Sequence, residues 1–497
     1  MNKLYYGDCL TVMRDMPVRS VDLIYLDPPF NSNRTYNAIY KDETGNPLPD
    51  QIEAFCDQWT LDPERERAIR AMPVLMVDSG IDDTVAQFWK TWTDALRKTQ
   101  PRLLAYLAYM VERLIWMKLV LKPTGSIYLH CDPTASHYIK IMMDGVFGHG
   151  NFRNEIVWHR SRGFKRKTAR QFTQKNDIVL FYAKDIQSHV FNTQYKPHKA
   201  EYVRRFKKDV DGRLYRDDVN PTRGGRRRIY LDETQGDIID NVWSDIPPVN
   251  PNAKERLGYA TQKPLALLER IIKASSNKGD VVFDPFCGCA TTLEAAHKLG
   301  RKWIGIDIAI HAIKRVAKVR LEDRLGLVEG RDFVIDGVPR SFEGAYDLWE
   351  RDTYQFQKWC VEQVDGFVTT KRTADGGIDG RLYFSVPGER SLQSMVLEVK
   401  GGKNVNISHI RALGNVLDTS GALMAGLIIL HPLTERRHRN YQQEMAQAGD
   451  TEIDGALYPR MQMLTVQEIL DGKRFDTPGA RGKRESWQQQ MDLPERD

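Results

Sequence analysis

Short apolar segments alternate with helical patterns along this 497-residue chain, and the alternation restricts the folds that it can adopt. The apolar segments are rich in β-branched and aromatic residues, which is typical of strands. The alternation of strands and helices predicts a parallel, doubly wound α/β sheet. The predicted strands are 3–6, 21–26, 125–130, 280–283 and 302–306, and the predicted helices between them include 102–121 and 292–299.

The order of elements changes after residue 354, where helix, strand, turn, strand, strand, helix and strand follow one another. This order predicts a second, smaller α/β unit. A chain of this length has room for about three domains. We expect one half of the large domain at 1–150, an insertion at 151–250, the other half at 251–340, the smaller unit at 345–475 and a disordered tail at 476–497.

Positive charge is concentrated in one window of the chain. The total is only +6, but residues 151–230 hold 21 Lys or Arg against 8 Asp or Glu, a net charge of +13. A single basic run is usually a solvated surface, whereas three runs interleaved with Tyr and Phe favour binding to the phosphates of a nucleic acid. The candidate DNA contacts are Arg160, Arg162, Lys165, Arg166, Lys167, Arg226, Arg227 and Arg228.

Several classes of protein are disfavoured by the sequence. The longest uncharged apolar stretch, 421–430, is half of what a membrane-spanning helix needs, and residues 1–8 do not resemble a signal peptide. Six cysteines without a CxxC pair indicate neither a disulfide framework nor a zinc site. We therefore expect a cytoplasmic protein with reduced thiols.

A candidate reaction site follows the predicted strand 21–26, where Asp27-Pro28-Pro29-Phe30 stands at the carboxyl end of the sheet. Such a segment can be an ordinary turn. However, two prolines fix the backbone, so that a carboxylate, main-chain carbonyls and an aromatic ring can converge on one planar group. Asp27 and the Pro28 carbonyl could accept the hydrogens of an exocyclic amine on a flipped base, while Phe30 stacks on its ring.

A second half-site lies about 250 residues later, in the segment 283–292, FDPFCGCATT. A glycine turn between strand and helix lets a ligand approach the backbone and presents free amides to it. Asp307 closes the next strand and is placed to accept the two hydroxyls of a ribose. The pattern suits an adenosyl cofactor.

The motifs in this order resemble the beta class of DNA amino-methyltransferases, which have a Rossmann-like sheet. The resemblance implies that Asp27 to Phe30 are catalytic, that Asp307 holds the ribose of S-adenosylmethionine, that Asp8 reads its adenine, and that 151–250 recognises the target. The cofactor loop would comprise Asp284, Pro285, Phe286, Cys287, Gly288, Ala290, Thr291 and Thr292, with Gln262, Lys263 and Pro264 as the element ahead of it.

Two features of these motifs carry further expectations. Ala290 stands where the family more often has glycine, and we expect it to be tolerated with a negative φ. Asp before the two prolines favours adenine as the target, with cytosine still open. The implied reaction is direct attack of the base nitrogen on the methyl group, which requires no covalent intermediate and no metal.

The smaller unit carries a second candidate site. Glu398 and Lys400 share one face of a predicted strand, and Asp379 precedes the neighbouring strand. Two carboxylates suit Mg²⁺, and the lysine could orient a water. An isolated ExK is usually an ordinary surface strand. The full arrangement, however, resembles Mrr-type endonucleases with the PD-(D/E)xK signature, despite Gln357 in the early helix and Glu398 where that type often has Gln.

Three functions are consistent with these patterns. The first is a bifunctional enzyme that methylates an amine in double-stranded DNA and cleaves DNA with Mg²⁺, in restriction-modification or phage defence. The second is a methyltransferase, for adenine or cytosine, whose terminal domain only binds DNA. The third is a cofactor-dependent DNA-binding regulator, which the complete set of catalytic side chains disfavours. A homodimer is left open.

Overall fold

The structure is a computed structural model. It describes residues 1–29, 35–38, 52–56, 59–132, 134–160, 172–219, 225–250, 253, 255–257, 262–310, 312–313, 318–369, 377–386 and 392–478, of which 35–38 and 52–56 are described as backbone only.

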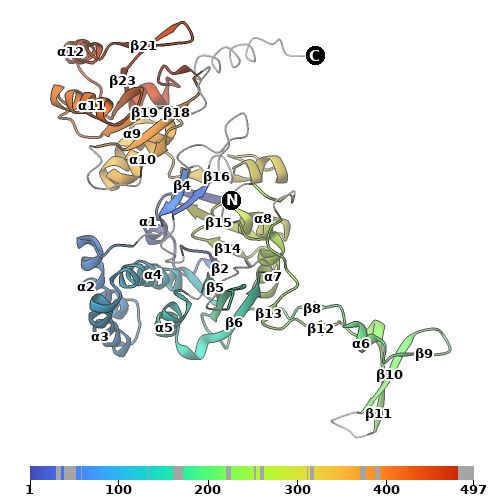
Figure 1. Ribbon diagram of the computed structural model, residues 1–497. Helices are drawn as coiled ribbons and strands as arrows, with labels where there is room; N and C mark the ends of the chain where they lie inside the picture. The colour runs from blue at the N-terminus through green and yellow to red at the C-terminus, as the bar shows by residue number, and fades with distance from the viewer. Residues whose placement is uncertain are drawn as a thin grey trace.

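A nine-stranded sheet forms the centre of the molecule (Figure 1). Six neighbouring strands, from β16 to β5, run parallel, whereas β7 is antiparallel to both β5 and β6. The large parallel α/β sheet is thus confirmed, and all five predicted strands lie in it. In spatial order the strands are β13 (Val242–Trp243), β6 (Phe152–His159), β7 (Asn176–Ala183), β5 (Leu121–Cys131), β2 (Val21–Leu26), β14 (Val281–Asp284), β15 (Lys302–Asp307), β1 (Asn2–Tyr6) and β16 (Phe333–Asp336).

Helices cover both faces of this sheet, as in a doubly wound fold. The helix α4 is apolar on most of its circumference and is accordingly almost fully buried. It packs with α1, α2, α3 and α5 on one face, while α7 and α8 pack on the other. Their bounds are α1 (Cys9–Asp15), α2 (Pro63–Asp78), α3 (Asp83–Thr99), α4 (Pro101–Val120), α5 (Ser136–Phe147), α7 (Leu265–Ser275) and α8 (Thr291–Lys298).

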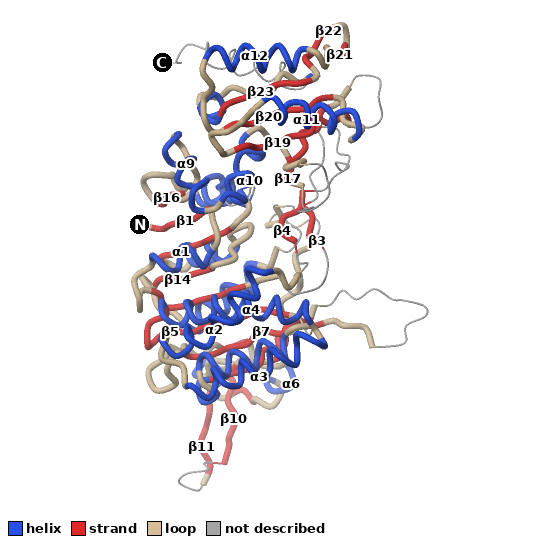
Figure 2. The backbone as a smooth tube through the Cα atoms, turned by 90° about the vertical axis from the view of Figure 1, so that its left-hand side faces the viewer, coloured by secondary structure: helices blue, strands red, loops and turns tan. Residues whose placement is uncertain are grey.

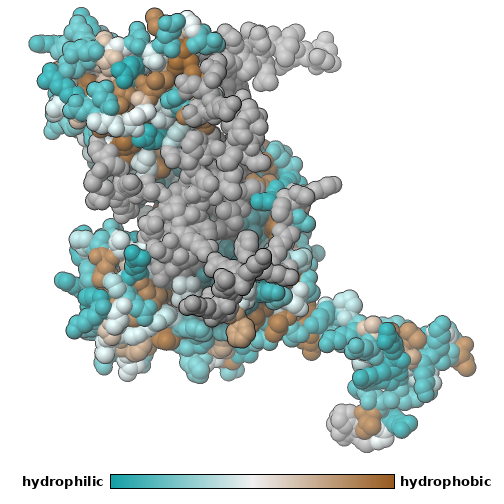
Figure 3. Space-filling view, in the orientation of Figure 1, coloured by the Kyte–Doolittle hydropathy of each residue, from teal (hydrophilic) through white to brown (hydrophobic). Residues whose placement is uncertain are grey.

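The basic segment divides into two parts. Strands β6 and β7 belong to the central sheet, so the part that leaves the sheet is narrower than the predicted insertion 151–250. The remainder is a thin arm that projects beyond β13 and exposes mostly hydrophilic side chains (Figures 1 and 3). It consists of β8 (Tyr195–Lys196), α6 (Ala200–Val203), β9 (Lys207–Lys208), β10 (Leu214–Val219), β11 (Arg226–Tyr230) and β12 (Asp237–Ile238).

The smaller unit lies at the opposite end of the sheet, beyond β16 (Figure 2). Its five-stranded sheet has the order β17-β18-β19-β20-β23, antiparallel from β17 to β19 and parallel from β19 to β23. Its elements are α9 (Phe342–Arg351), α10 (Thr353–Gln363), β17 (Phe367–Val368), β18 (Gly380–Phe384), β19 (Gln393–Lys400), α11 (Ile407–Thr419), β20 (Met424–Ile429), α12 (Glu435–Ala446), β21 (Asp450–Ile453), β22 (Ala456–Pro459), β23 (Met461–Thr465) and α13 (Val466–Leu470).

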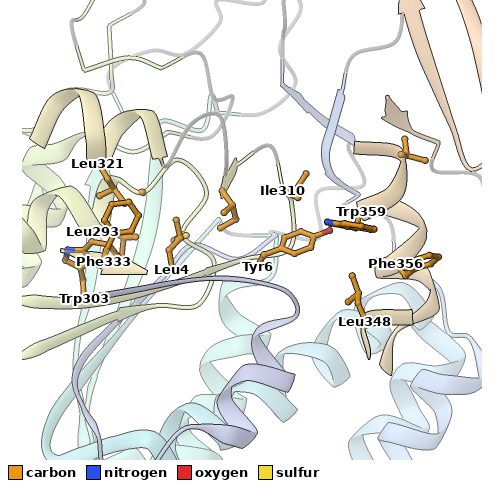
Figure 4. Close-up of a cluster of buried hydrophobic side chains, with 14 of the residues drawn as sticks. Leu4, Tyr6, Leu293, Trp303, Ile310, Leu321, Phe333, Leu348, Phe356 and Trp359 are labelled. Carbon is orange, nitrogen blue, oxygen red and sulfur yellow. The ribbon is translucent and has the colours of Figure 1, made fainter. Parts of the chain in front are cut away.

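The two units share one buried core rather than meeting through a linker. Tyr6, at the end of β1, points towards Trp359 of α10, and Leu348 of α9 lies beside them (Figure 4). The sequence predicted separate units and did not predict this continuity. The shared core arises because α9 and α10 present apolar side chains both to the edge of the nine-stranded sheet and to the five-stranded sheet of the smaller unit.

The remaining expectations concern the tail, the membrane and the cysteines. Residues 476–478 are ordered, since the Asp476 amide donates to Gln462 and Thr477 is buried; the predicted disorder of 476–478 is therefore wrong, and 479–497 lie outside the described residues. No helix in the described part of the chain is long and apolar enough to cross a membrane. The described cysteine side chains are buried free thiols.

Candidate active site

The candidate reaction site lies where the neighbouring strands β2 and β14 end. The parallel pairing of Ile24 with Phe283 brings Asp27 and Asp284 to the same edge of the sheet. Burial raises the pKa of Asp284 to about 7, and the charges of Asp27 and Asp307 add to this effect. The two predicted half-sites are therefore brought together by the fold.

Asp27 is held on one side only. The Lys263 ammonium donates a hydrogen bond to Asp27 Oδ2, and the two side chains are 12% and 14% exposed. Asp27 Oδ1 is buried and has no hydrogen-bond partner among the described residues. Pro28 is buried and Pro29 half-buried, whereas Phe30 lies outside the described residues. Oδ1 thus retains lone pairs that no described residue uses.

The loop after β14 is held by its own carboxylate. Asp284 accepts from the Phe286 amide at 3.0 Å and from the Thr292 hydroxyl at the start of α8. Ala290 adopts a left-handed conformation with φ 59°, so the expectation of a negative φ is wrong. The Ala290 amide closes a turn by donating to the Cys287 carbonyl at 2.8 Å, and Ala290 is the residue directly before α8. For a residue with a Cβ, a left-handed conformation costs about 1 kcal/mol.

Asp307, at the end of β15, faces the same loop. Its two oxygens accept from the amides of Gly288 and Ala309, both at 2.8 Å. Burial raises the pKa of Asp307 to about 6, although these hydrogen bonds oppose the shift. Each oxygen retains a second lone pair, so the carboxylate can still accept a donor from a ligand.

Asp8 is already engaged in the fold. It caps α1 by accepting from the Leu10 amide at 2.7 Å, and it forms an ion pair with Arg113 Nη2 at 2.5 Å. Arg113 in turn stacks on Tyr109, with its guanidinium carbon 3.4 Å from the ring centroid, and Tyr109 faces Phe286 of the cofactor loop. The sequence showed Arg113 and Tyr109 only as part of a helix, and nothing in the helical pattern marked them.

The element ahead of α7 divides between two places. Gln262 binds the segment before it, accepting from the Leu257 amide at 2.9 Å and donating to the Glu255 carbonyl at 2.6 Å. Pro264 directly precedes α7, whose first amide, that of Leu265, donates to Glu255 Oε2 at 3.1 Å. Lys263 contacts Asp27 at the reaction site.

A chain of buried polar side chains stands near Asp27. The Tyr25 hydroxyl and His130 Nδ1 are 3.0 Å apart, His130 Nε2 is 3.2 Å from Asp177, and Arg160 pairs with Asp177 at 2.8 Å. Arg160, predicted as a DNA contact, is thus tied to a buried carboxylate. His130 is the penultimate residue of β5, the strand beside β2, and its position next to the reaction site could have been inferred from the parallel sheet.

A known protein family matches the part of the chain that holds this site. A model of the DNA methylase family (N6_N4_Mtase) matches residues 21–318, more than half of the chain. The chain belongs to this family. The match includes Asp27, the cofactor loop and Asp307, and it ends before α9.

Two relatives in sequence agree with this assignment, and one solved structure shows a low similarity to the chain. Type II methyltransferase M.EcaI from Enterobacter cloacae is 29% identical over 297 residues, which are 51% of this chain and 65% of that relative's length. DNA adenine methyltransferase YhdJ from Escherichia coli (strain K12) is 26% identical over 320 residues, 63% of this chain and 80% of YhdJ. The structure of PvuII DNA methyltransferase (cytosine-N4-specific) covers 67% of this chain and 88% of its own, with 15% identity and a TM-score of 0.34.

The arm of this DNA methylase carries the other basic candidates. Arg228 pairs with Asp217 at 3.3 Å and lies over the Tyr215 ring, so its charge is partly satisfied within the arm. Arg226 and Arg227 are exposed, with no ion pair to another described residue. The candidates Arg162, Lys165, Arg166 and Lys167 lie outside the described residues.

The C-terminal candidates come together at one end of β18 and β19. Asp379 accepts from the Val399 amide at 2.7 Å, and Lys400 Nζ lies 2.7 Å from Glu398 Oε1. Gly377 has φ +91°, and a Cβ there would lie 3.5 Å from Glu398 Oε1, so the turn before Asp379 approaches the Glu398 carboxylate closely. No group of three or more His, Cys, Asp or Glu suited to a metal occurs within the described ranges.

Proposed function

We propose that this DNA methylase transfers a methyl group from S-adenosylmethionine to the exocyclic amine of adenine in double-stranded DNA. The observation that carries the proposal is that Asp27 has one buried oxygen without a hydrogen-bond partner among the described residues. Asp27 lies at the same edge of the sheet as the loop 284–292. An acceptor in that position suits an amine that brings N–H donors.

The residues at this edge fit the cofactor. Asp284 and Asp307 are carboxyls whose ionisation is opposed by burial, so a cation or hydroxyl donors beside them would be favoured. The loop before α8 turns through left-handed residues and brings backbone close to them. Asp307 would hold the ribose, and Asp284 with the start of α8 would hold the remainder. When bound, the cofactor supplies an activated methyl group.

The chain's own residues then position the amine and stabilise its charge. Asp27 Oδ1 would accept one N–H of the target amine, and the Pro28 carbonyl would accept the other. As the nitrogen becomes positively charged, the fixed carboxylate stabilises that charge without reorganisation. Burial at this edge excludes water from the reacting nitrogen. Such a mechanism depends on positioning and electrostatics and needs no covalent intermediate.

The choice of adenine rests on Asp27 before the two prolines, with YhdJ as an adenine-specific relative. The alternative target is the exocyclic amine of cytosine, because Asp before the two prolines only favours adenine. Both amines present the same donors to Asp27, so the identity of the methylated base decides between them.

The test uses the purified full chain, labelled S-adenosylmethionine and DNA from a methylation-deficient host. We expect the wild-type chain to transfer label and Asp27→Ala to transfer none. Asp78→Ala, an exposed carboxylate at the end of α2, is the matched control and should retain full activity. Full transfer by Asp27→Ala would refute the proposed site.

We further propose that the C-terminal unit cleaves DNA with Mg²⁺, in restriction-modification or phage defence. Asp379 directly precedes β18 and accepts from the Val399 amide of β19, which also carries Glu398 and Lys400; this supports a nuclease site of the PD-(D/E)xK kind. Asp379 and Glu398 would hold Mg²⁺, which needs only one or two protein carboxylates. The alternative is a unit that binds DNA without cleaving it. Because both proposed reactions act on DNA, we propose that the enzyme works in the cytoplasm.

Cleavage is tested with Mg²⁺ and DNA in several modification states. Lys400→Ala and Glu398→Ala should abolish cutting, while Lys403→Ala, an exposed lysine three residues away, should not. A wild-type chain that cuts none of these DNAs would leave the methyltransferase with a binding unit, and the nuclease proposal would be rejected.

A further inference from the structure

We propose that Lys263 is the positioning residue of Asp27, which goes beyond a role in cofactor binding. The inference rests on the proposed methyl transfer. Lys263 and Asp27 are 236 residues apart, yet their side chains form a hydrogen-bonded ion pair, and both are largely buried. This contact places the charge of Lys263 at the carboxylate that would receive the amine.

The ion pair fixes which oxygen of Asp27 is available. A carboxylate on a single-bonded side chain can rotate and exchange its oxygens, but the Lys263 ammonium engages Oδ2 and leaves Oδ1 open. Desolvating a lone carboxylate is also costly, and a paired cation offsets that cost. Lys263 thus keeps a charged acceptor in one orientation before the base arrives.

A cation this close to a nitrogen that becomes positive would by itself slow the reaction. The charges of neighbouring side chains offset this effect. Burial tends to raise the pKa of Asp177, but the hydrogen bond from His130 and the charges of His130, Arg160 and Lys263 outweigh it and lower that pKa. Asp177 is therefore a second buried carboxylate within electrostatic reach of Lys263.

Lys263 is hydrogen-bonded to Asp27 and lies within electrostatic reach of Asp177, which also pairs with Arg160. The negative charges of Asp27 and Asp177 together offset the positive charges of Lys263 and Arg160. The other groups of this cluster are the Tyr25 hydroxyl and the His130 ring, which bond to each other and leave Asp27 Oδ1 open.

The decisive experiment separates kcat from cofactor affinity in Lys263→Met, which keeps the length of the side chain and removes the charge. We expect kcat for methyl transfer to fall about 100-fold, as for a misplaced catalytic group. The Kd for S-adenosylmethionine, measured by calorimetry, should stay within about 2-fold because the charge of Lys263 is directed at Asp27. Lys263→Arg should recover most of the loss, since it retains a donor and a charge.

Lys273→Met, on an exposed face of α7, is the control and should match the wild type. If Lys263→Met does not fold because Asp27 is left unpaired, the double variant Asp27→Asn with Lys263→Met should fold and bind the cofactor. A wild-type kcat in Lys263→Met, or a loss of cofactor affinity equal to the loss of kcat, would overturn the inference. No transfer by the wild-type chain would instead refute the proposed function itself.

Discussion

Cofactor affinity should depend steeply on pH, because two carboxyls of the candidate cofactor site are protonated more readily than usual. Burial raises the pKa of Asp284 to about 7 and that of Asp307 to about 6. S-adenosylmethionine brings a cationic sulfonium and ribose hydroxyl donors, both of which favour ionised carboxylates. Lowering the pH should therefore weaken binding.

The size of the effect follows from these two values. If the cofactor binds only when both carboxyls are ionised, the apparent Kd rises about 100-fold between about pH 7.5 and about pH 5.5. Asp284→Asn removes the group with the higher pKa and keeps an acceptor for Phe286 and Thr292. In this variant only Asp307 titrates, and the same change of pH should raise Kd about 4-fold.

Isothermal titration calorimetry of the full chain across this pH range measures both quantities. A wild-type Kd that does not change, or an equally steep change in Asp284→Asn, would refute the reasoning. The stability of the cofactor-free chain should depend on pH in the opposite direction to cofactor affinity. The folded state retains protons on Asp284 and Asp307 that the unfolded chain has lost, so the free energy of unfolding should fall as the pH rises from about 4 to about 7. Thermal unfolding of the cofactor-free chain checks this direction.

Two further variants probe the arm and the contact between the units. The double variant Arg226→Ala, Arg227→Ala should weaken DNA binding and reduce the slope of log K against log salt concentration by about 2. A double variant at exposed arginines of α2 is the control and should leave this slope unchanged. An unaltered slope in the arm variant would exclude Arg226 and Arg227 as phosphate contacts. Gln355→Ala removes the donor, at 3.0 Å, to the Ile308 carbonyl beside Asp307, and should weaken cofactor binding about 10-fold; equal Kd values would show that α10 does not support the cofactor site.

Much of the fold could be predicted because its signals are local. Each strand of the parallel sheet that the sequence predicted is a short apolar run, and the boundaries of the run 21–26 agree with β2 residue for residue. The carboxyl ends of such strands lie at one edge, which is why Asp27, Asp284 and Asp307 could be placed together from the sequence.

The features that sequence did not predict depend on long-range packing. The contact of Lys263 with Asp27 joins segments 236 residues apart, and the motif around Lys263 indicated only that it precedes the cofactor loop. The left-handed conformation of Ala290, at the junction of the cofactor loop and α8, is not specified by local composition. The docking of α10 beside Tyr6 depends on two sheets sharing one core.

The most direct test of methylation at the Asp27 site is sequencing, with detection of modified bases, of genomic DNA from a methylation-deficient host that expresses the chain. The wild-type chain should place N6-methyladenine at one recurring sequence, and Asp27→Ala should leave the same sites unmodified. A genome without modified amines, or modified equally by Asp27→Ala, would contradict the account.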